Sequence, residues 1–105
     1  MKIMDWNIEE MTGYKPLTTF YSDFSIADNF GVNAIRETYQ NAREYWCDDY
    51  RYLTEIVMVL NWKAWEHSQR ADYCDLYIEL FQELQDYAFD TLKGEELEYF
   101  IRTTD

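Results

Sequence analysis

Glycine and proline, the two residues that most often interrupt helices and form tight turns, are scarce in this chain. Only 3 glycines and 1 proline occur in 105 residues. An all-β sandwich or barrel needs more turns than this composition supports. Hydrophobic residues make up 48% of the chain and aromatic residues 19%, which is enough for a packed core and argues against disorder. We therefore expect an all-α fold with a single domain over residues 1–105.

Apolar residues repeat at helical spacing from Asn33 onward. The pattern predicts a bundle of three main helices at about 33–47, 50–69 and 71–93, followed by a short helix at 95–101. A further short helix is predicted over 26–30, between Ser25 as its N-cap and Gly31. Residues 1–24 are rich in turn-forming and short polar residues, so we expect an irregular N-terminal segment there and a helical body over 25–105.

Capping residues mark the ends of the predicted helices. Asn33 and the Asp48–Asp49 pair stand where the first two main helices begin, and their side chains can accept hydrogen bonds from free backbone N–H groups. Gly94 stands just past the third main helix, where a left-handed residue commonly ends a helix.

The helix predicted at 50–69 has apolar residues on two faces. One face consists of Leu53, Ile56, Val57, Leu60 and Ala64. Met58, Trp62 and Trp65 lie on nearly the opposite side. Such a helix is usually central in its domain and buried on both faces, which is the interpretation we favour. The alternative is that Met58, Trp62 and Trp65 form an exposed patch that binds a partner or a second copy.

The third main helix carries an acidic stripe. It consists of six acids spaced 3, 4, 4, 3 and 4 residues apart: Asp72, Asp75, Glu79, Glu83, Asp86 and Asp90. These positions fall within an arc of about 80° and extend over about 27 Å. No Lys or Arg lies between Arg70 and Lys93, so the helix itself does not neutralise them. The stripe is either a solvated face or a surface that offers carboxylates to a basic partner.

The net charge restricts the kind of partner. The chain has 21 acidic and 9 basic residues, a formal net charge of −12. This charge repels phosphates, so we expect no direct binding to nucleic acid or to membranes. A basic protein groove that normally holds a nucleic-acid backbone would attract the acidic stripe. Arg36 and Arg43, seven residues apart on one helix, are expected to act as ion-pair partners.

Catalytic and metal-binding patterns do not emerge from the sequence. His67 is a lone histidine, expected at the edge of the core stripe of the helix at 50–69 and without a Ser or Cys nucleophile placed beside it. Cys47 and Cys74 form no CxxC motif and are expected to be small buried residues. We therefore expect a non-enzymatic protein with no metal and no cofactor. The first residues lack a signal-peptide pattern and the longest apolar run is 56–60, which favours a cytoplasmic protein.

Three stretches carry a resemblance to a known group of proteins. They are FYSDFSIADNFG at 20–31, YLTEIVMVLNWK at 52–63 and LKGEELEYFIRTTD at 92–105. Together they resemble a family of small acidic proteins carried by conjugative elements and phages of Gram-positive bacteria, a setting that includes anti-CRISPR inhibitors of Cas9-type nucleases. The similarity covers most of residues 19–105. It implies an inhibitor of such a nuclease, and because these stretches are core and turn patterns it assigns no functional residue.

The sequence thus leaves two functions open. The leading hypothesis is an inhibitory binding protein that uses the acidic stripe against a basic nucleic-acid-binding protein such as a Cas9-type nuclease. The alternative is a structural or accessory protein of a mobile element, acting through a homodimer or through the patch of Met58, Trp62 and Trp65. The first hypothesis is compatible with a monomer, whereas the second includes a dimer.

Overall fold

The computed structural model describes residues 17–104. These residues form five helices and no strand, which confirms the all-α class. The helices are α2 (Leu17–Asp28), α3 (Val32–Trp46), α4 (Tyr50–Glu66), α5 (Ala71–Thr91) and α6 (Gly94–Thr104). Among the described helices, none has both the length and the apolar character needed to cross a membrane.

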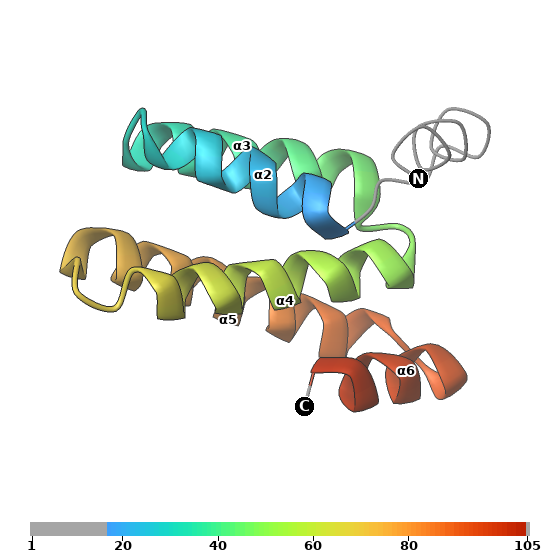
Figure 1. Cartoon of the computed structure of the whole chain (residues 1–105). Helices are drawn as coiled ribbons and strands as arrows, with labels where there is room; N and C mark the ends of the chain where they lie inside the picture. Colours follow the sequence, from blue (N-terminus) through green and yellow to red (C-terminus); the bar gives the residue numbers. More distant parts are fainter. Residues whose placement is uncertain (1–16, 105) are drawn as a thin grey trace.

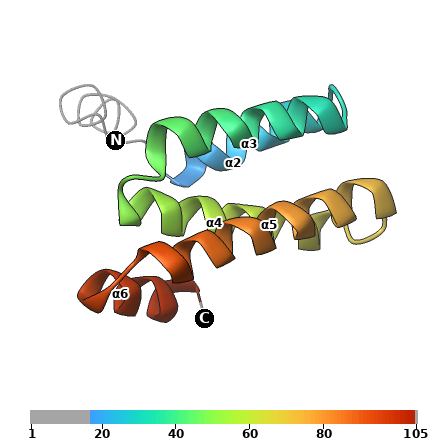
Figure 2. The same cartoon turned by 180° about the vertical axis from the view of Figure 1, so that it is seen from behind.

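The helices are arranged in three layers (Figures 1 and 2). The α2–α3 hairpin forms the first layer and packs on one side of the α4–α5 hairpin. On the opposite side lies α6, whose contacts with the other described helices are with α4 and α5. Because α6 is short, it covers the half of this side where α4 begins and α5 ends, and the other half is left without a covering helix.

The core is centred on α4, which contacts the four other described helices. Leu53, Ile56 and Leu60, from the predicted first apolar face, are each 0% exposed. Their aliphatic side chains pack with residues of α5 such as Tyr77 and Leu84, which are also 0% exposed. The expectation that this helix is central in the fold is therefore confirmed.

The prediction of an irregular segment over 1–24 is wrong for residues 17–24, which belong to α2. Residues 1–16 lie outside the described residues. The apolar residues of α2 include a helical row, since Phe20, Phe24 and Ala27 are 4 and 3 residues apart and all are buried. Phe20 packs edge-on against Trp46 and Tyr52. Burial of these rings stabilises a helix that the polar residues around them disfavour.

The other helix boundaries lie within three residues of those predicted. The end of α4 comes at Glu66 instead of position 69, because residues 67–69 form a turn. Asp49 is the N-cap of α4, as predicted, and accepts a hydrogen bond from the Arg51 amide at 2.8 Å. The N-cap of α3 is Gly31 and not Asn33. Gly31 has φ 108°, a backbone conformation that favours glycine, and it is the last residue of the α2–α3 connection.

The connection between α5 and α6 differs slightly from the prediction. The C-cap of α5 is Leu92, whose backbone is extended, so Gly94 is not the first residue after the cap. Gly94 instead begins α6 and has φ 59°. The left-handed conformation expected of this glycine is present, but it starts the next helix.

Candidate functional site

The acidic stripe lies on the exposed side of α5. All six of its residues are exposed to solvent, and the residues on the opposite side of α5, including Leu76, Leu80 and Leu84, are buried against the core. The structure therefore brings the six acids to one surface, as their spacing predicts.

Basic residues of α3 neutralise the middle of the stripe. Arg36 donates to Glu79, with Nη1 to Oε2 at 3.1 Å, and Arg43 forms an ion pair with Glu83. Glu83 also accepts a hydrogen bond from the hydroxyl of Tyr39 at 3.1 Å. The prediction that Arg36 and Arg43 are ion-pair partners is confirmed. These two acids therefore join α3 to α5, and part of their charge is compensated.

The remaining acids of the stripe lie toward the two ends of α5 and are less compensated. Asp75, Asp86 and Asp90 have no ion pair within residues 17–104, and Asp72 has only a long one, 3.9 Å from Arg70. Beyond Asp90 the chain adds three exposed acids in α6: Glu95, Glu96 and Glu98. Lys93 is the one basic residue between positions 86 and 98. We call Asp86, Asp90, Glu95, Glu96 and Glu98 the acidic end.

The second apolar side of α4 is exposed, which corrects the interpretation that both sides are buried. Trp62 is 55% exposed, Trp65 is 78% exposed and Met58 is half-buried. They line a groove of about 400 Å³, which we call the tryptophan groove. Its further walls come from Val57, Asn61, Phe81, Thr103 and Thr104. Core burial stops here because α6 ends at Thr104 and covers only part of this side of α4.

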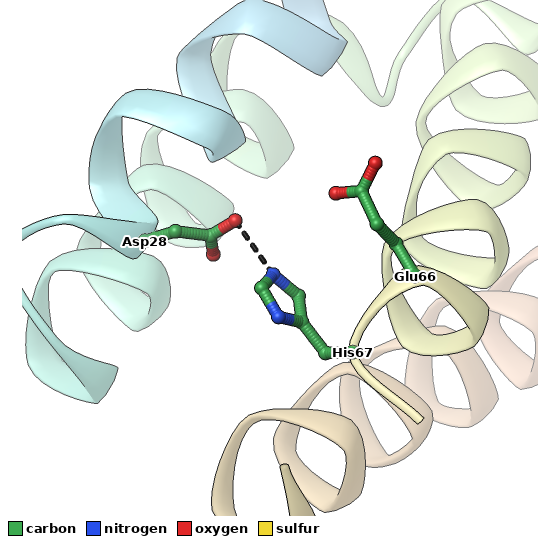
Figure 3. Close-up of side chains that lie close together, drawn as sticks. All are labelled: Asp28, Glu66 and His67. Carbon is green, nitrogen blue, oxygen red and sulfur yellow. Dashed lines mark hydrogen bonds and ion pairs between the residues drawn. The ribbon is translucent and has the colours of Figure 1, made fainter. Parts of the chain in front are cut away.

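A polar cluster around the buried Lys63 joins α2 to the end of α4. Figure 3 shows Asp28 of α2 directed toward Glu66 and His67, with His67 Nε2 2.8 Å from Asp28 Oδ2. The Lys63 ammonium lies 2.7 Å from Asp28 Oδ2 and 2.6 Å from Glu66 Oε1. It also donates to Ser25 Oγ at 3.1 Å. The side chain of Lys63 is only 2% exposed. This cluster therefore satisfies a buried charge with two carboxylates and a hydroxyl.

Hydrogen bonds within the cluster set the protonation of its members. Burial alone would raise the pKa of Asp28, but hydrogen bonds from Lys63, Tyr77 and His67 outweigh this effect and hold it below the ordinary value. Burial would lower the pKa of Lys63, but its bonds to Asp28 and Glu66 outweigh burial and raise it. Hydrogen bonds from Lys63 and Tyr21 lower the pKa of Glu66. The cluster therefore holds one ammonium between two carboxylates over a wide pH range.

The spacing of the cluster is also that of a metal site. One ligand atom from each of Asp28, Glu66 and His67 lies within 4.8 Å of the others. However, the ammonium of Lys63 is bonded to both carboxylates, so it already supplies the positive charge that a metal ion would bring. His67 is half-buried and stacks on Tyr77 with ring centroids 5.8 Å apart. It is the C-cap of α4 and not, as expected, a residue within the helix. These contacts indicate a structural role for the cluster.

Sequence reasoning missed the cluster, although one signal was present. Lys63 follows Ile56 and Val59 by 7 and 4 residues, so it lies on the same face as two core residues. A lysine at such a position needs buried carboxylate partners. Of the two cysteines, Cys47 is buried and Cys74 is half-buried, and both are free thiols. Burial raises the pKa of Cys47 to about 11, which makes it unreactive at neutral pH.

Comparisons with known proteins do not assign this chain to a family. No protein-family model, no curated protein and no solved structure matches this chain.

Proposed function

We propose that this protein is a non-enzymatic binding protein that acts in the cytoplasm and covers a basic surface of a nucleic-acid-binding protein. The observation that carries the proposal is the acidic end. There, the last two acids of the stripe are followed along the chain by three exposed acids of α6, and Lys93 is the one basic residue among them. An uncompensated group of carboxylates on rigid helices attracts a groove lined with Lys and Arg.

The proposal specifies how the surface would act. Carboxylates along a helix repeat at about 5–6 Å, which is close to the spacing of phosphates along a nucleic-acid strand. The protein would therefore compete with nucleic acid for the same groove. Inhibition would be stoichiometric and would weaken steeply as salt increases. A Cas9-type nuclease is the partner class that the sequence resemblance suggests, because such enzymes hold RNA and DNA in positively charged channels.

A competition experiment tests this function. The purified protein is added to a Cas9-type nuclease before guide loading, and in a second series after loading, at several salt concentrations. We expect inhibition at low salt that fades as salt rises, and the order of addition identifies the blocked step. If neither inhibition nor a complex is observed at low salt, a Cas9-type nuclease is excluded as the partner.

A matched pair of variants tests the surface itself. Asp86→Lys with Asp90→Lys reverses two charges in the acidic end and should lower affinity for the basic partner about tenfold or more. Glu37→Lys with Glu44→Lys makes the same net change on α3, at two exposed acids that have no ion pair among the described residues. If both double variants bind equally weakly, total charge and not the acidic end controls binding.

A further inference from the structure

The tryptophan groove lies on a side of the molecule that the proposed function does not use. Trp65 is 78% exposed and Trp62 is 55% exposed. Burial of a tryptophan side chain is more favourable than its exposure to water, so this exposure is unusual. Ile78 of α5, which is 40% exposed, extends the apolar surface beyond Phe81. Exposed tryptophans beside a groove are typical of protein-binding sites.

The same side of the α4–α5 hairpin already holds one helix. Packing of α6 there uses Phe100, which is 0% exposed and contacts Phe89 edge-on, while Tyr99 contacts Tyr50. The groove begins at the last residues of α6, Thr103 and Thr104, and continues over the half of the hairpin that α6 does not cover. The uncovered half therefore continues a surface that packs against an amphipathic helix.

The charges beside the groove indicate which kind of helix fits. Going round α5 from Ile78, the next row contains Asp75 and Gln82. Asp75 is exposed and has no ion pair within residues 17–104. A helix in the groove would therefore have a free carboxylate along its α5 side. A second copy of the chain, with a net charge of −12, would bring further negative charge to this place.

From these observations we infer that the tryptophan groove binds an amphipathic helix of a partner protein. The helix places apolar residues at positions i, i+3, i+4 and i+7 against Trp62, Trp65 and Phe81. Its basic flank lies over Asp75. Trp65 is the anchor of the site because it is the most exposed of the apolar groove residues.

A designed peptide tests the inference without knowledge of the natural partner. The probe is a fluorescein-labelled peptide of about five helical turns, with leucines on one face and lysines on the other. Its binding to the full chain is measured by fluorescence anisotropy. A peptide of the same composition in scrambled order, with no apolar face, is the control for unspecific charge attraction. Equal binding of the two peptides would overturn the inference.

Two variants of similar exposure locate the peptide. Trp65→Ala should raise the Kd about tenfold or more, as expected for the loss of a central tryptophan. Tyr45→Ala removes another exposed aromatic, 75% exposed but on α3, and should leave the Kd within about twofold. Circular dichroism checks that both variants remain helical. A Kd that Trp65→Ala leaves unchanged, or that both variants raise equally, would overturn the site.

The oligomeric state provides a second, independent readout. Sedimentation of the chain across a range of concentrations should show a monomer, which leaves the groove open for the partner helix. A dimer that Trp65→Ala dissociates would overturn the inference, because a second copy would then occupy the groove. The inference and the proposed function can also be tested independently of each other. Asp86→Lys with Asp90→Lys tests binding through the acidic end, whereas Trp65→Ala tests the groove and leaves that end intact.

Discussion

At the scale of single residues, Lys63 is the least expected feature of the fold. Its ammonium lies in the interior, between α2 and α4, and is bonded to Asp28 and Glu66. A buried ion pair does not guarantee a gain in stability, because both charges lose their hydration. Removing one partner, however, leaves the other charge buried and uncompensated. The cluster therefore fixes how α2 packs on α4, whatever its net contribution to the free energy of unfolding is.

We predict that Lys63→Met destabilises the protein by about 3 kcal/mol, because it leaves Asp28 without its nearest positive charge. The measurement is urea unfolding followed by circular dichroism. Lys93→Met is the matched control, since Lys93 is exposed and has no ion pair among the described residues, and it should change the free energy of unfolding by less than about 0.5 kcal/mol. A loss below about 1 kcal/mol for Lys63→Met would show that the carboxylates find other compensation.

The same cluster predicts a pH dependence. The pKa of Asp28 is lower in the folded chain than its ordinary value of 3.8, so its ionised form stabilises the fold above that pH. This contribution is lost as pH falls through the folded pKa. The pKa of Lys63 is raised above 10.5, so its contribution is present below pH 10.5 and is lost at higher pH. Stability from the cluster is therefore greatest between these limits.

The acidic limit can be measured with one variant. The difference in unfolding free energy between the natural chain and Asp28→Asn should shrink as the pH falls below about 4. Repulsion among the exposed acids changes with pH too, but it is common to both proteins and cancels in the difference. A difference that stays constant down to pH 3 would contradict the lowered pKa of Asp28.

At the scale of helices, the sequence predicted elements well wherever apolar residues were dense. The helices α3, α4 and α5 lie within three residues of their predicted bounds, because each has an apolar stripe of several turns. Among the α2 side chains that the structure describes, Phe20, Phe24 and Ala27 mark the buried face, and short polar residues around them resemble a loop. The burial of those rings depends on α3 and α4, which local sequence does not describe.

For the candidate sites, too, the sequence predicted what depends on a single helix and missed what depends on contacts between helices. Helical spacing correctly placed all six acids of the stripe on one exposed side of α5. It could not show that Arg36 and Arg43 reach Glu79 and Glu83 from another helix. Nor could it decide whether Trp62 and Trp65 are buried, because that depends on where α6 ends in space.

At the scale of the whole molecule, the layers distribute the negative charge unevenly. The α2–α3 layer supplies the two arginines that compensate the centre of the stripe. The α6 layer supplies three further acids beside its end. The free carboxylates of the stripe therefore lie at both ends of α5, and the larger group of free carboxylates is the acidic end, where α5 passes into α6. Any basic partner would meet that region first, because long-range attraction follows the uncompensated charge.

This arrangement gives a prediction in which removing a native interaction improves binding. Arg43→Gln frees Glu83, which adjoins the acidic end, and should raise affinity for a basic partner several-fold at low salt. The cost in stability should stay below about 1 kcal/mol, because both side chains of the ion pair are at least one-third exposed. Isothermal titration at two salt concentrations, together with urea unfolding, measures both effects.

Arg102→Gln separates a local effect from the change in total charge. Arg102 is exposed on α6 and has no ion pair among the described residues, so its removal adds the same negative charge without freeing a carboxylate of the stripe. If affinity rises equally in both variants, net charge alone attracts the partner. If Arg43→Gln weakens binding at low salt, the α3–α5 ion pairs are themselves part of the contact, and the proposal that free carboxylates make it would be wrong. A gain specific to Arg43→Gln requires that the freed Glu83 meets the partner, because attraction between exposed charges decays within about 10 Å at 0.1 M salt.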